Sequence, residues 1–146
     1  MRVFKLKKNE EHHIWNDTFD LKIEESKKIN CIIVSNPEQS NCLCVINHLV
    51  CKSLENKNIA HLIIASEYRQ LHDITTFGSI NVGYEYDGVE QSGNLLLDIF
   101  DIDKNKEVDM LEENFLIILP GGNIHIKFVE PQEKMILEMS LQQQVI

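Results

Sequence analysis

A histidine that follows a tight turn is the residue of this sequence best suited to chemistry near neutral pH. The turn PGGN, residues 120–123, separates the apolar run FLIIL from the run IHIKF, and His125 is the second residue after it. An imidazole titrates near pH 6.5 and can bind a metal, transfer a proton or form hydrogen bonds. Proline can end a strand harmlessly and glycine permits positive φ, so the turn is expected to fix the position of this histidine.

Strand alternation leaves two orientations open for His125. On the returning strand His125 and Lys127 share one face, whereas Ile124, Ile126 and Phe128 share the other. If the apolar set packs against an opposite sheet, His125 points outward; if a barrel interior is partly polar, it points inward. A shift of one residue exchanges the two faces. We hypothesise that His125 faces a cavity and belongs to a ligand site.

The elements around the turn are predicted to be strands. Residues 3–6 alternate apolar with basic side chains, as an edge strand does, and further short runs rich in valine and isoleucine recur between turn clusters. One helix is expected in residues 17–29, where Phe19, Ile23 and Leu21 could line a face. The pattern predicts an all-β protein with a minor helix, an antiparallel sandwich or barrel of at least seven strands. The expected core includes Leu95, Leu97, Phe115, Ile117, Ile136 and Leu137.

Length and composition fit one domain, residues 1–146. The hydrophobic share of 43% can supply a full core, and a net charge of -9 argues against nucleic acid as a partner. No apolar run reaches the ~18 residues that a membrane span needs. No secretory signal is evident, so a cytoplasmic location is expected. The four cysteines are therefore expected to be reduced, buried thiols.

Residues 120–125 read P-x-G-x-x-H, which resembles the core of the second signature of the cupin superfamily. From about Cys42 to Leu141 the chain is similar to the cupin-like YhcH/YjgK/YiaL family, as a divergent member. The segments that carry the resemblance are SEYRQLHDIT, INVGY, DIFDIDKNKEVDML, ENFLIILPGGNIH and EKMILEMSL, in that order. The chain departs from the family at Tyr68, Leu71 and Thr75, where the family has histidine, tyrosine and glutamine.

The resemblance implies a cupin-like barrel of the jelly-roll type, also called a double-stranded β-helix. Its expected function is to bind a sugar or sialic-acid type of ligand in carbohydrate metabolism, with isomerase or anomerase activity and a divalent metal such as zinc or copper. The first cupin signature, H-x-H with a glutamate, is missing. One alternative, favoured by the departures at Tyr68 and Thr75, is a metal-free, non-catalytic subunit or regulatory sugar-binding barrel. Another is a metal-free sugar-nucleotide isomerase or epimerase of the cupin superfamily.

Anomer interconversion requires a proton to be taken from one oxygen and given to another, which suits an imidazole, a carboxylate and a phenol. The candidate catalytic residues are His125, Asp73, Tyr84 and Glu85, and the candidate metal ligands are His125 and His72. Structural roles are the alternative: Asp73 could cap a turn, Tyr84 could be a barrel aromatic, and Glu85 would then face solvent. A homodimer that pairs through the strand at residues 3–6 is also expected.

Overall fold

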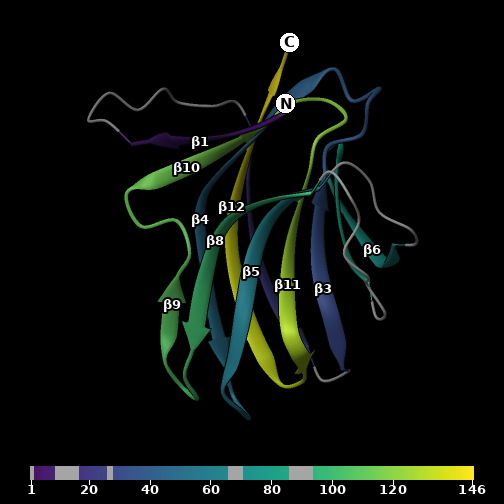
Figure 1. The fold of residues 1–146 in the computed structure, drawn as a ribbon. Coiled ribbons are helices and arrows are strands. Elements are labelled where there is room, and N and C mark those ends of the chain that lie inside the picture. The colour runs from purple at the N-terminus through teal and green to yellow at the C-terminus, as the bar shows by residue number, and fades with distance from the viewer. Residues whose placement is uncertain (1, 9–16, 26–27, 66–70, 86–93) are drawn as a thin grey trace.

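The computed structural model describes residues 2–8, 17–25, 28–65, 71–85 and 94–146. Within these ranges the secondary structure is twelve β-strands and no α-helix, which confirms the all-β class (Figure 1). The strands are β1 (Val3–Lys7), β2 (Asp17–Glu25), β3 (Ile29–Ser35), β4 (Cys42–Ser53), β5 (Asn58–Ala65), β6 (His72–Phe77), β7 (Ile80–Glu85), β8 (Leu95–Ile102), β9 (Glu107–Asp109), β10 (Asn114–Ile118), β11 (Asn123–Gln132) and β12 (Met135–Val145). The same part of the chain holds no helix long and apolar enough to cross a membrane.

The strands form two antiparallel sheets. Sheet A has the order β1-β10-β4-β12-β2, with β9 paired to β4, and sheet B has the order β6-β7-β3-β11-β5-β8. No described strand of one sheet is a ladder neighbour of a strand of the other, so the described strands form a sandwich and not one closed barrel. Among these strands β1 pairs with β10 alone, which confirms the edge strand expected at residues 3–6.

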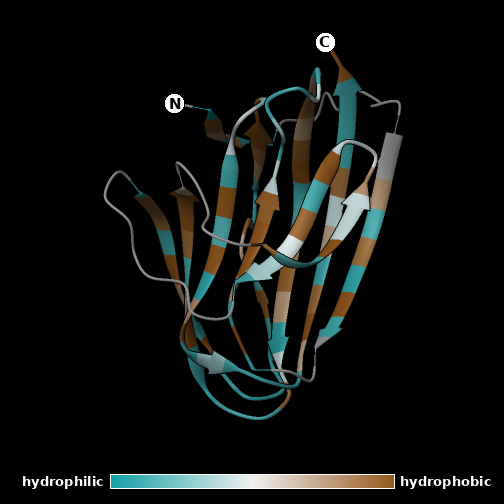
Figure 2. Ribbon diagram, turned by 90° about the vertical axis from the view of Figure 1, so that its right-hand side faces the viewer, coloured by the Kyte–Doolittle hydropathy of each residue, from teal (hydrophilic) through white to brown (hydrophobic). Residues whose placement is uncertain are grey.

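The core lies between the two sheets and takes alternate residues from each strand. Figure 2 shows the resulting bands of apolar and polar residues along the strands. Sheet B contributes Ile32, Val34, Leu62, Ile124, Ile126 and Phe128, and sheet A contributes Cys44, Ile46, Leu49, Leu116, Leu137 and Leu141. Phe128 is the largest fully buried side chain among the described residues. Burial of these side chains is the main source of stability for the sandwich.

The expected core was partly wrong. Leu137 is fully buried in the core and Leu97 packs partly against it. The other four expected residues are outside the buried core: Leu95, Phe115, Ile117 and Ile136. On β10 the core positions are Leu116 and Ile118, one residue away from the expected pair. The run FLIIL is apolar at every position, so its sequence does not reveal which alternate set faces inward.

The helix expected in residues 17–29 is also wrong. β2 pairs with β12 from Asp17 to Glu25, and Phe19, Leu21 and Ile23 pack against the core as alternate residues of a strand. Their spacing of two residues fits a strand, and the long antiparallel partner satisfies the backbone. The Phe19 ring contacts the Phe77 ring edge-on, with centroids 6.1 Å apart, and so joins sheet A to sheet B at the side formed by β2 and β6.

The PGGN turn is held in place by Asn36, a fully buried residue between β3 and β4. The Gly121 N–H donates to the Asn36 carbonyl at 2.7 Å, and the Asn36 N–H donates to the Gly122 carbonyl at 3.0 Å. The Asn36 side-chain amide donates to the carbonyls of Cys42 and Ile118, at 2.9 Å each. Gly121 has a φ of 86°, which glycine adopts without strain. These bonds fix the start of β11 and therefore the position of His125 on that strand.

Candidate functional site

His125 lies on β11, in the middle of sheet B. It pairs with Ile33 of β3 and Ile63 of β5, neither of which belongs to the core cluster between the sheets, whereas its chain neighbours Ile124 and Ile126 do. The apolar set of β11 therefore packs against the opposite sheet, and His125 is on the outer face of sheet B. It does not face the space between the sheets, yet only 7% of its surface is exposed.

The His125 side chain is a neutral imidazole at neutral pH. Its pKa is lowered from 6.5 to about 4, mainly by burial and to a smaller extent by the nearby Lys127 ammonium. Its Nε2 atom has no hydrogen-bond partner within the described part of the chain. A buried polar atom without a partner costs about 1–3 kcal/mol, so such an atom is a candidate for contact with a ligand.

Three further chemical groups share the outer face of sheet B with His125. Lys127 pairs with Cys31 of β3, and Cys31 pairs with Glu85 of β7, which places these side chains in one row across the sheet. The pKa of the Cys31 thiol is raised, first by burial and then by the Glu85 carboxylate, while Lys127 opposes the rise. We call these four residues, His125, Lys127, Cys31 and Glu85, the His125 face.

Two of the candidate site residues lie on the other side of sheet B. Tyr84 is buried in the core, where it pairs with Ile32 and with His72 of β6. Directly paired residues point to the same side of a sheet, so the His72 side chain is on the core side, opposite to His125. The structure therefore does not bring His72 and His125 together as a pair of metal ligands.

Asp73 and Glu85 have different surroundings. Asp73 is exposed and has a φ of 50°, at the point where the pairing of β6 with β7 shifts register. Glu85 is buried, so the expectation that it faces solvent is wrong. Within the described ranges no three His, Cys, Asp or Glu side chains come together so that they could hold a metal ion. Tyr68, one of the departures from the family pattern, lies outside the described residues.

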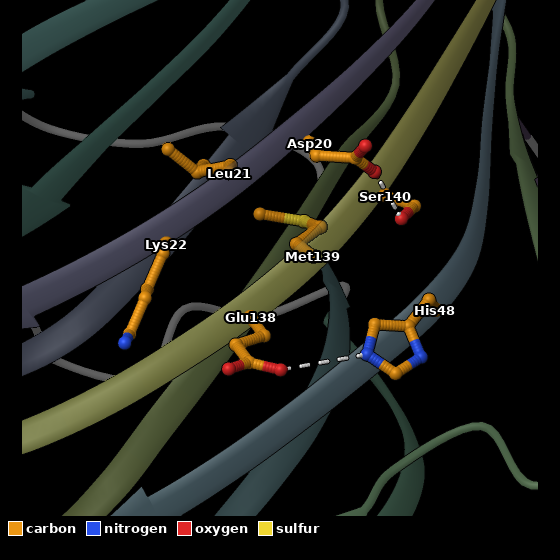
Figure 3. Close-up of a pocket in the computed structure, with 7 residues that line it drawn as sticks. All are labelled: Asp20, Leu21, Lys22, His48, Glu138, Met139 and Ser140. Carbon is orange, nitrogen blue, oxygen red and sulfur yellow. Dashed lines mark hydrogen bonds and ion pairs between the residues drawn. The ribbon is translucent and has the colours of Figure 1, made fainter.

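A polar hollow, which the sequence did not reveal, lies on the outer face of sheet A (Figure 3). It has a volume of about 300 Å³ and is lined by Asp20 and Lys22 of β2, Glu138 and Ser140 of β12, and His48 of β4. We call it the sheet A groove. The Ser140 hydroxyl donates to the Asp20 carboxylate at 2.7 Å, and Nε2 of His48 is 3.9 Å from the Glu138 carboxylate.

Strand pairing brings these residues together. Ser140 pairs with both His48 and Asp20, and Glu138 pairs with Lys22, so the five side chains form two adjacent rows on three strands. The pairing of β12 with β4 shifts by one residue directly after Ser140. The only signal in the sequence was the outward alternation of Glu138 with Ser140 and of Asp20 with Lys22. This alternation indicates a shared outer face only if residues 17–25 are predicted to be a strand.

Comparison with known proteins gives no match. No protein-family model, no curated protein and no solved structure is significantly similar to the chain.

Proposed function

We propose that the protein binds a small polyhydroxylated ligand of the sugar type at the His125 face of sheet B. The observation that carries this proposal is the unpartnered Nε2 of His125, a polar atom that is buried but has no described hydrogen-bond partner. A neutral imidazole can both donate to and accept from a hydroxyl group. The Lys127 ammonium and the Glu85 carboxylate on the same face add a donor and an acceptor of the kind that orient polar ligands.

The sequence resemblance supports the same ligand class. The segment PGGNIH resembles the second cupin signature, and cupin-like proteins of the YhcH/YjgK/YiaL family are implicated in sugar and sialic-acid processing. We therefore also propose that this sandwich is a jelly roll related to the cupin-like barrels.

Binding without catalysis is better supported than isomerase or anomerase activity. An efficient general base has a pKa near the working pH, whereas that of His125 is lowered to about 4. Tyr84, a candidate proton donor, is buried on the opposite face of sheet B. Glu85 is a candidate catalytic carboxylate that does share a face with His125. Anomerase activity would be detected by saturation-transfer NMR as faster exchange between the α and β forms of a reducing sugar.

The binding proposal is tested by matched histidine substitutions on the two sheets. A panel of reducing sugars and acidic sugars is screened by ligand-observed NMR, and the binders are titrated by calorimetry. His125→Ala should weaken binding about tenfold or more, because one hydrogen bond from a buried group is lost. His48→Ala, in the sheet A groove, is the control and should bind like the parent.

The two variants also show whether the ligand binds at the His125 face or in the sheet A groove. Loss of binding in His48→Ala with retention in His125→Ala would assign the ligand to the sheet A groove and refute the proposed site. Circular dichroism and thermal melts of both variants establish that each is folded. If no sugar in the panel binds the parent chain, the proposed ligand class is wrong.

A further inference from the structure

Two sheet edges of opposite charge lie on one side of the sandwich. β1, at the edge of sheet A, carries Lys5 and Lys7, and β8, at the edge of sheet B, carries Asp98 and Asp101. The Lys5 ammonium is 3.8 Å from the Asp98 carboxylate, so the two edges adjoin each other. Within the described ranges β1 pairs with β10 alone and β8 pairs with β5 alone, so the other side of each strand has no described strand partner.

Both edge strands also carry exposed apolar side chains on their outer faces. Phe4 and Leu6 of β1 are 40% and 44% exposed, and Leu96 and Ile99 of β8 are 47% and 52% exposed. Leu96 pairs with Ile63 and Ile99 pairs with His61, so both point to the outer face of sheet B. Open edge strands with exposed apolar residues are templates for pairing with another chain.

We propose that a second copy of this chain covers this side, in a two-fold dimer in which β1 of each copy meets β8 of the other. The charges on the two edges favour this arrangement over one in which each edge strand pairs with the same strand of the second copy. If each edge met its own counterpart, Lys5 and Lys7 would face the same lysines, and Asp98 and Asp101 the same aspartates. Like charges placed opposite each other across strands are destabilising, whereas opposite charges are favourable.

The proposed dimer also accounts for the apolar residues. When β1 meets the partner's β8, sheet A of one copy continues into sheet B of the other. Phe4 and Leu6 then lie beside the partner's Leu96 and the partner's Ile99 on one continuous outer face. The contact occurs twice and is closed by the two-fold symmetry, so association stops at the dimer. Local charge complementarity is needed because a chain with a net charge of -9 repels its own copy at longer range.

Charge-reversal variants test the proposal. In one variant both edges are acidic, through Lys5→Glu and Lys7→Glu; in the other both are basic, through Asp98→Lys and Asp101→Lys. Sedimentation velocity over a concentration series should give a dimer for the parent chain and a dimer Kd at least about tenfold higher for each variant alone. Mixing the two variants should restore the dimer. A chain that carries all four substitutions should dimerise on its own, because its edges are again of opposite charge.

The control is Lys28→Glu with Lys134→Glu, which changes the net charge as much as the acidic-edge variant does but lies beside central strands. It should keep the parent Kd to within a few-fold, and thermal melts should show every variant folded. The Lys5–Asp98 ion pair is partly exposed, so its loss should hardly change stability. A parent chain that sediments as a monomer at every concentration would overturn the proposal. So would edge variants that keep the parent Kd.

Discussion

Acidification should destabilise the fold through His125. When the chain unfolds, the imidazole regains its ordinary pKa of 6.5, whereas in the folded protein its pKa is about 4. Between these two values the unfolded state binds more protons than the folded state, so stability falls as the pH falls from about 6.5 to about 4. Below about 4 both states are protonated and the loss is complete. Above about 6.5 both are neutral and His125 adds no pH dependence.

The size of this loss follows from the two pKa values. A difference from 6.5 to about 4, at 1.36 kcal/mol for each pKa unit, corresponds to about 3 kcal/mol of unfolding free energy. This is a large fraction of the 5–15 kcal/mol that typically stabilises a domain. The imidazole is 7% exposed, so solvent can screen the effect only weakly. Two charged groups of the His125 face also affect the protonation of His125. Lys127 favours the neutral imidazole, and Glu85 would favour the protonated one.

Chemical denaturation of the parent and of His125→Gln at a series of pH values measures the effect. Carboxylates also titrate in this range, so the quantity of interest is the difference between parent and variant, in which their contribution cancels. That difference should shift by about 3 kcal/mol in favour of the variant between pH 7 and pH 4. His48→Gln, on the outer face of sheet A, is the matched control and should follow the parent. Parallel pH profiles for the parent and His125→Gln would refute the buried, neutral state of His125.

Three other predictions concern the thiols, the core and the turn. Burial raises the pKa values of Cys44 and Cys51 to about 12, and all four cysteines are buried, so none should react with Ellman's reagent at neutral pH until the chain is unfolded. Rapid labelling of the native protein would contradict this. Phe128→Ala should lower the unfolding free energy by about 3–5 kcal/mol, whereas Val129→Ala, at the exposed neighbouring position, should change it by less than about 1 kcal/mol. Equal denaturation midpoints for these two variants would show that the assigned alternation of β11 is wrong. Gly121→Ala should cost about 1–2 kcal/mol, since its φ of 86° disfavours any residue with a Cβ. An unchanged melting temperature would mean that the turn tolerates another conformation.

The class of the fold could be predicted from the sequence because alternation and turn residues recur along the whole chain. The edge strand β1 followed from the alternation of apolar with basic residues that was noted for residues 3–6. The expected helix failed because Phe19 and Ile23 are four residues apart, a spacing that fits one face of a helix as well as alternate positions of a strand. The long pairing of β2 with β12, which decides the matter, is not visible in residues 17–29 alone.

The candidate site was harder to predict because the central strands of sheet B are buried on both faces. Ile32 and Ile33 are both fully buried although they point to opposite sides of β3. Where a strand is apolar on both faces, the sequence gives its existence but not its orientation. His125 was therefore correctly placed on a strand, while its face could be known only from the packing. The sheet A groove depends on the register of three strands that are far apart in the chain, and no local pattern encodes that register.

Asn36 has a consequence for how the sandwich comes apart. The chain passes from sheet B to sheet A between β3 and β4, and returns from sheet A to sheet B between β10 and β11. Both crossings meet at Asn36, whose side chain reaches Ile118, a residue 82 positions away in the sequence. The Asn36 side chain therefore joins two crossings between the sheets that are far apart along the chain. Because neither crossing can open without breaking bonds to the other, the two sheets should unfold in one cooperative step, and the corner at Asn36 should exchange its amide hydrogens only when the whole molecule opens.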